Sequence, residues 1–106
     1  MSKISILLTC GAGASSGFMA ANMRKAAKAR GLELEAKARS ESEIEIYGPE
    51  ADCIMVGPHL SYLVDDIRKI LGDNGPKVLL MKREYYSSLD GDEALDDLLN
   101  CLGKEA

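Results

Sequence analysis

The sequence contains no tryptophan, one phenylalanine and one histidine, and aromatic residues occupy only 5% of its 106 positions. Proteins that bind single-stranded nucleic acids generally stack bases on aromatic side chains beside a basic surface. The composition therefore excludes a general nucleic-acid binder. The single histidine, His59, leaves almost no material for a His-rich metal site or a His-based catalytic triad. We expect no nucleic-acid partner, no metal and no cofactor.

Long apolar runs are also missing, because no stretch approaches the roughly 20 residues that cross a bilayer. The N-terminus lacks the small-residue cleavage site of a signal peptide. We therefore expect a cytoplasmic protein without direct membrane insertion. A length of 106 residues, 46% of them hydrophobic, predicts a single domain over residues 1–106, which we expect to be a monomer. So small a chain has little room for both a deep substrate pocket and a cofactor domain, which argues against a self-contained metabolic enzyme.

Acidic residues are scarce in residues 1–40, and basic residues are outnumbered in residues 41–106. Residues 1–40 contain seven Lys or Arg residues against two acidic ones, a balance of +5. Residues 41–106 contain six against fifteen, a balance of −9. This asymmetry differs from the concentrated basic surface of a nucleic-acid binder. The acidic residues between 90 and 97 are interpreted as helix caps and a solvated helix face.

Runs of apolar residues alternate with helical patterns along the whole chain. The β-branched and Leu-rich run 3–9 predicts a strand buried on both faces, and the alternating run 32–38 predicts a half-exposed edge strand. Further strands are predicted over 52–56 and 76–81, and helices over 18–30, 40–48, 60–71 and 94–102. The order βαβαβαβα predicts an α/β fold: an open four-stranded parallel sheet with helices on both faces and strand order 2-1-3-4.

Any chemistry is expected at the end of the first strand, where Cys10 stands. In open parallel sheets, ligands bind beyond the carboxyl ends of the strands, where the strand order reverses. The seven residues that follow have almost no bulky side chains, so their N–H groups can form an anion cradle at a helix N-terminus. The same positive field favours a nucleophilic thiolate at Cys10. The predicted phosphate-binding residues are Gly11, Ala12, Gly13, Ala14, Ser15, Ser16 and Gly17. The alternative is a tight turn with a buried cysteine.

Other residues receive structural interpretations. Cys53 lies inside an apolar strand and Cys101 inside a helical pattern, where cysteine usually behaves as a small buried hydrophobe. Met19 and Met23 are predicted to pack in the core. His59 follows the third strand, and two alternatives stay open for it: a solvated residue at a helix start, or a functional contact facing Cys10.

Three blocks of the sequence carry a resemblance to a known family. They are KISILLTCGAGASSGFMAANM, ADCIMVGPHLSYLVDDI and YYSSLDGDEAL. With these blocks the chain resembles the IIB component of the bacterial phosphotransferase system (PTS), lactose/cellobiose (chitobiose) class, over nearly its whole length. Residues 14–17 read Ala-Ser-Ser-Gly where many relatives carry Met-Ser-Thr-Ser, so the sugar is left unassigned.

The resemblance implies a phosphotransferase that acts in a relay. A phosphohistidine on a IIA protein would donate its phosphoryl group to Cys10, and Cys10 would pass it to a sugar held by the membrane IIC transporter. The residues support this independently, because phosphoryl transfer needs mainly positioning and charge neutralisation, which backbone N–H groups can supply without a metal. No sugar pocket is then required in this chain.

Three other kinds of protein with a parallel α/β architecture are alternatives. Low-molecular-weight tyrosine phosphatases and arsenate reductases also have a nucleophilic cysteine after the first strand. The phosphatase loop, however, needs an arginine six positions after its cysteine, and that position holds Ser16. A CheY-like domain is phosphorylated on an aspartate at the end of its third strand, where this chain has Gly57-Pro58.

A relay also needs a shared docking face around Cys10. Its rim is expected from the other strand-end loops, residues 57–62 and 83–90, with Tyr62, Tyr85 and Tyr86 as candidate aromatic contacts. For Tyr62, packing on its own helix is the alternative. Arg24 and Lys28, on the basic first helix, are expected to steer an approaching partner.

Overall fold

A computed structural model of the chain describes residues 3–9, 14–72 and 75–103. Four parallel strands form one sheet in the order β2-β1-β3-β4, which confirms the predicted topology. The strands are β1 (Ile4–Thr9), β2 (Leu34–Ala38), β3 (Cys53–Val56) and β4 (Lys77–Leu80). The α-helices are α1 (Ala14–Ala29), α2 (Ile44–Tyr47), α3 (Tyr62–Leu71), α4 (Arg83–Ser87) and α5 (Gly91–Leu102). Short 3₁₀ turns η1 (Glu41–Glu43), η2 (Gly48–Glu50) and η3 (Pro58–Leu60) complete the described elements.

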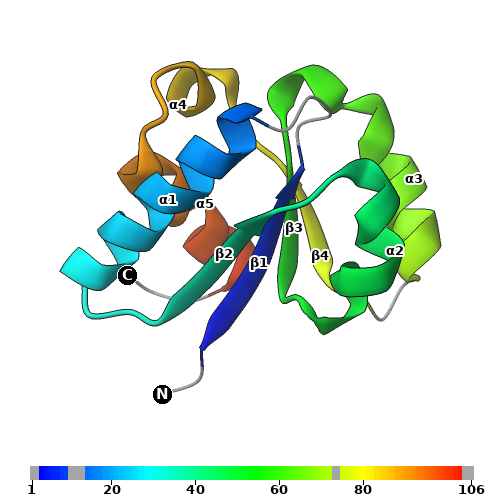
Figure 1. The fold of residues 1–106 in the computed structure, drawn as a ribbon, viewed down its shortest axis with the longest axis horizontal. Helices are drawn as coiled ribbons and strands as arrows, with labels where there is room; N and C mark the ends of the chain where they lie inside the picture. The colour runs from blue at the N-terminus through cyan, green and yellow to red at the C-terminus, as the bar shows by residue number, and fades with distance from the viewer. Residues whose placement is uncertain (1–2, 10–13, 73–74, 104–106) are drawn as a thin grey trace.

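The helices cover both faces of the sheet, as Figure 1 shows, with α1 and α5 on one side and α2 and α3 on the other. Successive residues of β1 point to opposite faces, so Ile6 and Leu8 pack with α1 and α5, while Leu7 packs with α2 and α3. Met19 and Met23 of α1 are fully buried in the first layer, as predicted. The strand buried on both faces is therefore central, and the half-exposed strand β2 is at an edge.

The helix ends follow the sequence signals. Gly31, Gly72 and Gly103 have φ values of 74°, 80° and 73°, a region that glycine enters without steric cost. At the start of η1, the Glu43 carboxylate accepts a hydrogen bond from the Ser40 N–H at 3.0 Å. The glycines thus end their helices, and the capping contact begins the 3₁₀ turn that follows β2.

Two helical segments differ most from the predictions. Helix α1 begins at Ala14, whereas residues 11–17 were predicted as a loop and the helix was predicted to begin at Phe18. The polar segment 82–92 was predicted without a helix, yet it contains α4. In both places a short run of small or polar residues forms a helical turn without the apolar periodicity that predicts a helix. Tertiary packing stabilises these turns.

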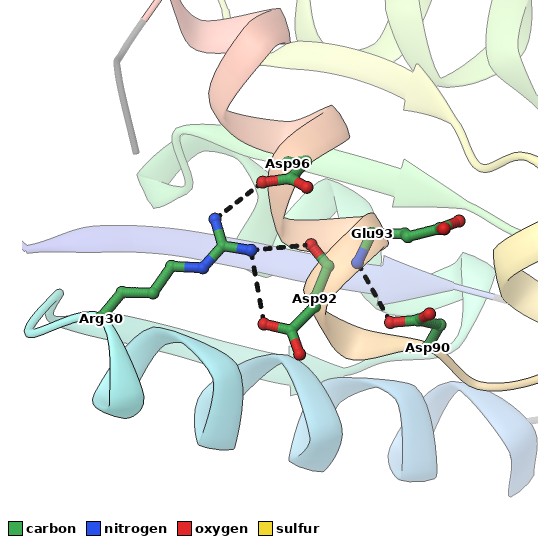
Figure 2. A network of polar contacts seen from close by, with 5 residues as sticks. All are labelled: Arg30, Asp90, Asp92, Glu93 and Asp96. Carbon is green, nitrogen blue, oxygen red and sulfur yellow. Dashed lines mark hydrogen bonds and ion pairs between the residues drawn. The ribbon is translucent and has the colours of Figure 1, made fainter.

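Helices α1 and α5 are joined by an ion-pair network (Figure 2). Arg30, just after α1, donates to the Asp96 carboxylate at 2.7 Å and lies 3.3 Å from Asp92 Oδ1, both in the first half of α5. The hydrogen bond to Asp96 raises the pKa of Arg30. Asp90 accepts a hydrogen bond from the Glu93 N–H at 3.2 Å and so caps α5. The predicted capping role of the acidic segment is confirmed for Asp90, and part of that segment pairs with Arg30.

Candidate functional site

The carboxyl ends of the four strands lie at the upper edge of the sheet in Figure 1, where α1, α3 and α4 begin. Backbone hydrogen bonds continue the strand pairing beyond the strands themselves. The Gly57 N–H donates to the Thr9 carbonyl at 2.8 Å, and the Met81 N–H donates to the Val56 carbonyl at 2.8 Å. The edge is therefore a firmly connected platform, and the end of β1 lies at its centre, between β2 and β3.

Cys10 follows Thr9, the last residue of β1, and α1 begins at Ala14. Cys10, Gly11, Ala12 and Gly13 lie outside the described residues. Ala14, Ser15, Ser16 and Gly17, predicted as the rest of a phosphate-binding loop, form the first turn of α1. The first N–H groups of any α-helix lack acceptors within the helix and carry the positive end of its dipole. The helical turn thus retains the donors that the loop was expected to supply.

Two polar atoms at this edge are buried and have no hydrogen-bond partner in the described part of the chain. They are the Thr9 hydroxyl oxygen and Arg39 Nε. Leu8 pairs with Ala38, so Thr9 and Arg39 are the next residues along the two adjacent strands. The Arg39 guanidinium stacks 4.6 Å from the centre of the Tyr47 ring. Unsatisfied buried groups cost free energy, and this edge contains both of those found among the described side chains.

Replacing Thr9 with Val should stabilise the protein by about 1 kcal/mol, because the change removes an unsatisfied buried hydroxyl and keeps the side-chain shape. Denaturant unfolding of both proteins measures the difference. The matched control is Thr9→Ser, which keeps the hydroxyl but loses a buried methyl group and should be less stable than the parent. A destabilised Thr9→Val variant would show instead that the hydroxyl makes a favourable interaction.

The rim of the platform contains the predicted aromatic residues in three different environments. Tyr62, at the start of α3, is 67% exposed, so it does not pack on its helix. Tyr86 is half-buried, and its ring centre lies 6.3 Å from that of His59, which places η3 beside α4. His59 is exposed. Phe18, on α1, is 65% exposed and was not among the aromatic contacts predicted from the sequence.

Tyr85 was predicted as a docking contact, and this prediction is wrong. Its side chain is 2% exposed, and its hydroxyl donates to the Asp97 carboxylate at 2.6 Å. Burial, together with this hydrogen bond, raises the pKa of Tyr85. The short helix α4 turns Tyr85 inward against α5 and leaves Tyr86 nearer the rim. Sequence alone did not show the helix and so could not tell the two neighbouring tyrosines apart.

Arg24 and Lys28 lie far along α1 from its first turn. At 1.5 Å per residue, Arg24 is about 15 Å and Lys28 about 21 Å along the helix axis from Ala14. The Arg24 guanidinium also donates to the Ala36 carbonyl of β2 at 2.6 Å. Both distances exceed a Debye length at physiological salt, so these cations contribute little to the field at the platform.

No described group of three or more His, Cys, Asp or Glu side chains is arranged to hold a metal ion. In the same described segments, no helix combines the length and apolar character needed to span a bilayer. The features of the site are therefore a strand-end cysteine position, a helix start and an aromatic rim.

The sequence and the fold both have relatives. The model of the family described as "PTS system, Lactose/Cellobiose specific IIB subunit" matches residues 5–97. The galactose-specific EIIB component of Lactococcus lactis subsp. cremoris is 27% identical over 103 residues, which cover 90% of this chain and 95% of that protein. The oligo-beta-mannoside-specific EIIB component of Bacillus subtilis is 26% identical over 97 residues, covering 92% and 94%.

A longer relative has the same segment within a larger protein. The lactose-specific EIICB component of Lacticaseibacillus casei is 28% identical over 96 residues, which are 89% of this chain but 17% of that relative. The chain therefore spans about a sixth of it.

Two solved structures share the fold. The lactose-specific IIB domain of Streptococcus pneumoniae superposes with a TM-score of 0.80 at 17% identity, covering 93% of this chain and 97% of that one. The cellobiose-specific IIB component of Borrelia burgdorferi gives a TM-score of 0.77 at 20% identity, covering 96% and 94%. The family model matches most of the chain, and the observed sheet order agrees with these structures. The chain thus belongs to the lactose/cellobiose-specific IIB subunits of the sugar phosphotransferase system.

Proposed function

We propose that this chain is a phosphoryl carrier that uses Cys10 as its acceptor. The donor is the phosphohistidine of a IIA protein, and the final acceptor is a sugar bound by a membrane IIC transporter. The supporting observation is the place of Cys10 in the chain. It follows the central strand β1 at the edge where ligands bind in open parallel sheets, and four residues later the 16-residue helix α1 begins.

The first transfer moves the phosphoryl group from nitrogen to sulfur. The Cys10 thiolate attacks phosphorus, the S–P bond forms, and the N–P bond of phosphohistidine breaks, leaving its electron pair on the imidazole, which takes up a proton. In this proposal the N–H groups at the start of α1 donate to the charged oxygens of the transferring phosphoryl group. Fixed donors of this kind stabilise the equatorial oxygens in the transition state without a metal or cofactor.

The second transfer moves the group from sulfur to oxygen. A hydroxyl of the sugar attacks phosphorus, loses its proton, and the S–P bond breaks to regenerate the Cys10 thiolate. Water must not replace the sugar in this step, and the chain has Ser16 where a phosphatase loop would carry its arginine. The absence of that guanidinium suits a carrier that holds its phosphocysteine until the sugar arrives.

The partners belong to the rest of the system. A relative in which IIB and IIC segments share one name, EIICB, supports a IIC partner for this chain. Relatives named for galactose, cellobiose and oligo-beta-mannoside are 26–27% identical to it. Because these identities are nearly equal, we propose a sugar as the final acceptor and assign no particular sugar. We place the carrier in the cytoplasm as a monomer, between IIA and the inner face of IIC.

The experiment that tests the proposal follows the mass of the intact chain after incubation with phosphorylated IIA. One phosphoryl group should be gained and kept until IIC and its sugar are added. In a second arm, para-nitrophenyl phosphate should be hydrolysed no faster than by the Cys10→Ala variant. Rapid hydrolysis would favour the phosphatase reading, and a failure to take up phosphoryl groups from IIA would contradict the carrier.

The exposed aromatics Phe18 and Tyr62 should contribute to docking, because both lie on elements that begin at the platform edge and aromatic side chains are effective interface anchors. Replacing Tyr62 with Ala should slow transfer from IIA by about tenfold with little change in melting temperature. Initial rates at sub-saturating IIA measure this effect.

The matched control is Ile70→Ala. Ile70 is 49% exposed and lies on the same helix as Tyr62, but it is near the other end of α3, about 12 Å along the helix axis from Tyr62. This variant should transfer at the parent rate. Equal slowing by both variants, or none by Tyr62→Ala, would show that the docking face lies elsewhere.

A further inference from the structure

Two cysteines that the phosphoryl relay does not use lie next to each other. Cys53 is the first residue of β3 and is fully buried in the layer shared with α1 and α5. Cys101 is near the end of α5 and is half-buried. The Cys53 thiol interacts with the Cys101 thiol, and neither is in a disulfide. Residues 48 positions apart in the sequence thus have neighbouring thiols.

Cys101 is the member of this pair that solvent reaches. Cys101 lines an open cavity of about 420 Å³ beside the start of β4, together with Lys77 and Val78. Lys77 is also the residue that pairs with Cys53 in the sheet, so the cavity lies beside the strand next to the buried thiol. Arg68 and Lys77 give its wall a positive charge. A small anionic oxidant can therefore approach Cys101, while Cys53 stays covered.

We infer that Cys53 and Cys101 form a redox pair, which a low-molecular-weight disulfide such as oxidised glutathione converts into an intramolecular disulfide. Cys101 attacks one sulfur of the reagent, a mixed disulfide forms, and one glutathione leaves as the thiol. Cys53 then attacks the Cys101 sulfur, the protein disulfide forms, and the second glutathione leaves. Two protein thiols are oxidised, and one glutathione disulfide is reduced to two thiols.

The order of the two steps follows from burial. Burial of Cys53, and its contact with Cys101, raise the pKa of the Cys53 thiol, so Cys53 is a poor first nucleophile. Cys101 is the exposed partner and reacts first. In the mixed disulfide Cys53 is the neighbouring thiol, so its attack is intramolecular, and this proximity offsets the small thiolate fraction of a buried cysteine.

The pair is separate from the phosphoryl site. Cys53 pairs with Ile6 in the sheet, three residues before the end of β1, and it opens β3, whereas Cys10 follows the end of β1. Oxidation therefore cross-links β3 to α5 without using Cys10. A disulfide that closes so long a loop restricts the unfolded chain, so the oxidised protein should be the more stable form.

The test oxidises the folded Cys10→Ser variant with glutathione disulfide, so that only this pair can react. Mass spectrometry should show the loss of two hydrogen atoms and a linked peptide containing Cys53 and Cys101. The melting temperature should rise by about 5 °C or more relative to the reduced protein. A stable glutathione adduct on Cys101 without ring closure, or no reaction at all, would overturn the inference.

Two further variants separate the roles of the thiols. With Cys101→Ser added, the protein should resist oxidation, because Cys53 is covered; glutathione on Cys53 would contradict the order of steps. With Cys53→Ala added instead, the mixed disulfide on Cys101 should accumulate. The Cys101→Ser change lies at a half-buried position and keeps the test valid if Cys53→Ala fails to fold.

Discussion

The Cys10→Ala variant is expected to lose phosphoryl uptake from phosphorylated IIA by roughly 10⁴-fold or more, the scale on which covalent enzymes fall when their nucleophile is removed. The reason is chemical: without the sulfur, no S–P bond can form, and α1 supplies donors but no acceptor. The fold should survive, because Cys10 lies beyond the last residue of β1. Rapid-quench transfer measurements, with circular dichroism as a check on folding, test this expectation.

The control for this experiment is Cys101→Ser. It removes another thiol from the same chain at the opposite end of the sheet, where the cavity beside β4 lies. It should accept phosphoryl groups at the parent rate. Wild-type uptake by Cys10→Ala, or a comparable loss in Cys101→Ser, would mean that the acceptor has been misassigned.

The second large effect concerns stability and is expected at Gly91. A Cβ atom added there would lie 2.4 Å from the backbone carbon and oxygen of Asn22 in α1. Backbone cannot move aside as a flexible side chain can, so α1 and α5 would have to separate. We expect Gly91→Ala to destabilise the fold by about 3 kcal/mol, at the upper end of the range for overpacking. For a domain of this size the melting temperature should fall by roughly 12–20 °C.

Gly17→Ala is the control for Gly91→Ala, because the same substitution is expected not to destabilise the fold at this position. Gly17 lies in the first turns of α1, and among the described residues no atom outside its own helix lies within 4 Å of an added Cβ. The change should leave stability equal or raise it by up to about 1 kcal/mol, because glycine is a weak helix former. Thermal unfolding of both variants makes the comparison. Similar melting temperatures for Gly91→Ala and the parent would show that the close contact of α1 and α5 is relieved at little cost.

The sheet could be predicted because each strand has a pattern that its position requires. β1 is apolar at nearly every residue from Ile4, and a central strand of a parallel sheet is covered on both faces. The alternation over 32–38 indicated the edge strand β2, although the structure has this strand only over Leu34–Ala38. The strand order follows from these two facts with the rule for right-handed crossovers.

The contacts around α4 and α5 could not be predicted, because they depend on where α1 lies. Leu89 adopts a positive φ of 54°, and its carbonyl accepts a hydrogen bond from the Asn22 side chain at 2.8 Å. Gly91 is next to this connection and packs directly on the backbone of α1. From the sequence, Gly91 was only one residue of a polar segment. The residues around a glycine do not indicate that a helix from a distant part of the chain packs against its backbone.

Some features of the candidate site could likewise be predicted from the sequence, and others could not. The position of Cys10 could be predicted from the strand that precedes it and the small residues that follow. The start of α1 could not, because Ala14 to Gly17 have the composition of a loop and form a helical turn. Phe18 and Tyr86 differ in exposure from Tyr85 only through the packing of α1 and α4. Exposure of a single aromatic residue is a tertiary property, so residue type alone selected the buried Tyr85 together with Tyr62 and Tyr86.

The most direct measurement of the central claim is the location of the phosphoryl group. The protein is incubated with phosphorylated IIA, digested under conditions that preserve phosphocysteine, and sequenced by tandem mass spectrometry. The carrier proposal predicts one phosphorylated residue, Cys10, on the peptide that also contains the first turn of α1. Phosphorylation of His59, of an aspartate, or of Cys53 or Cys101 in place of Cys10 would contradict it.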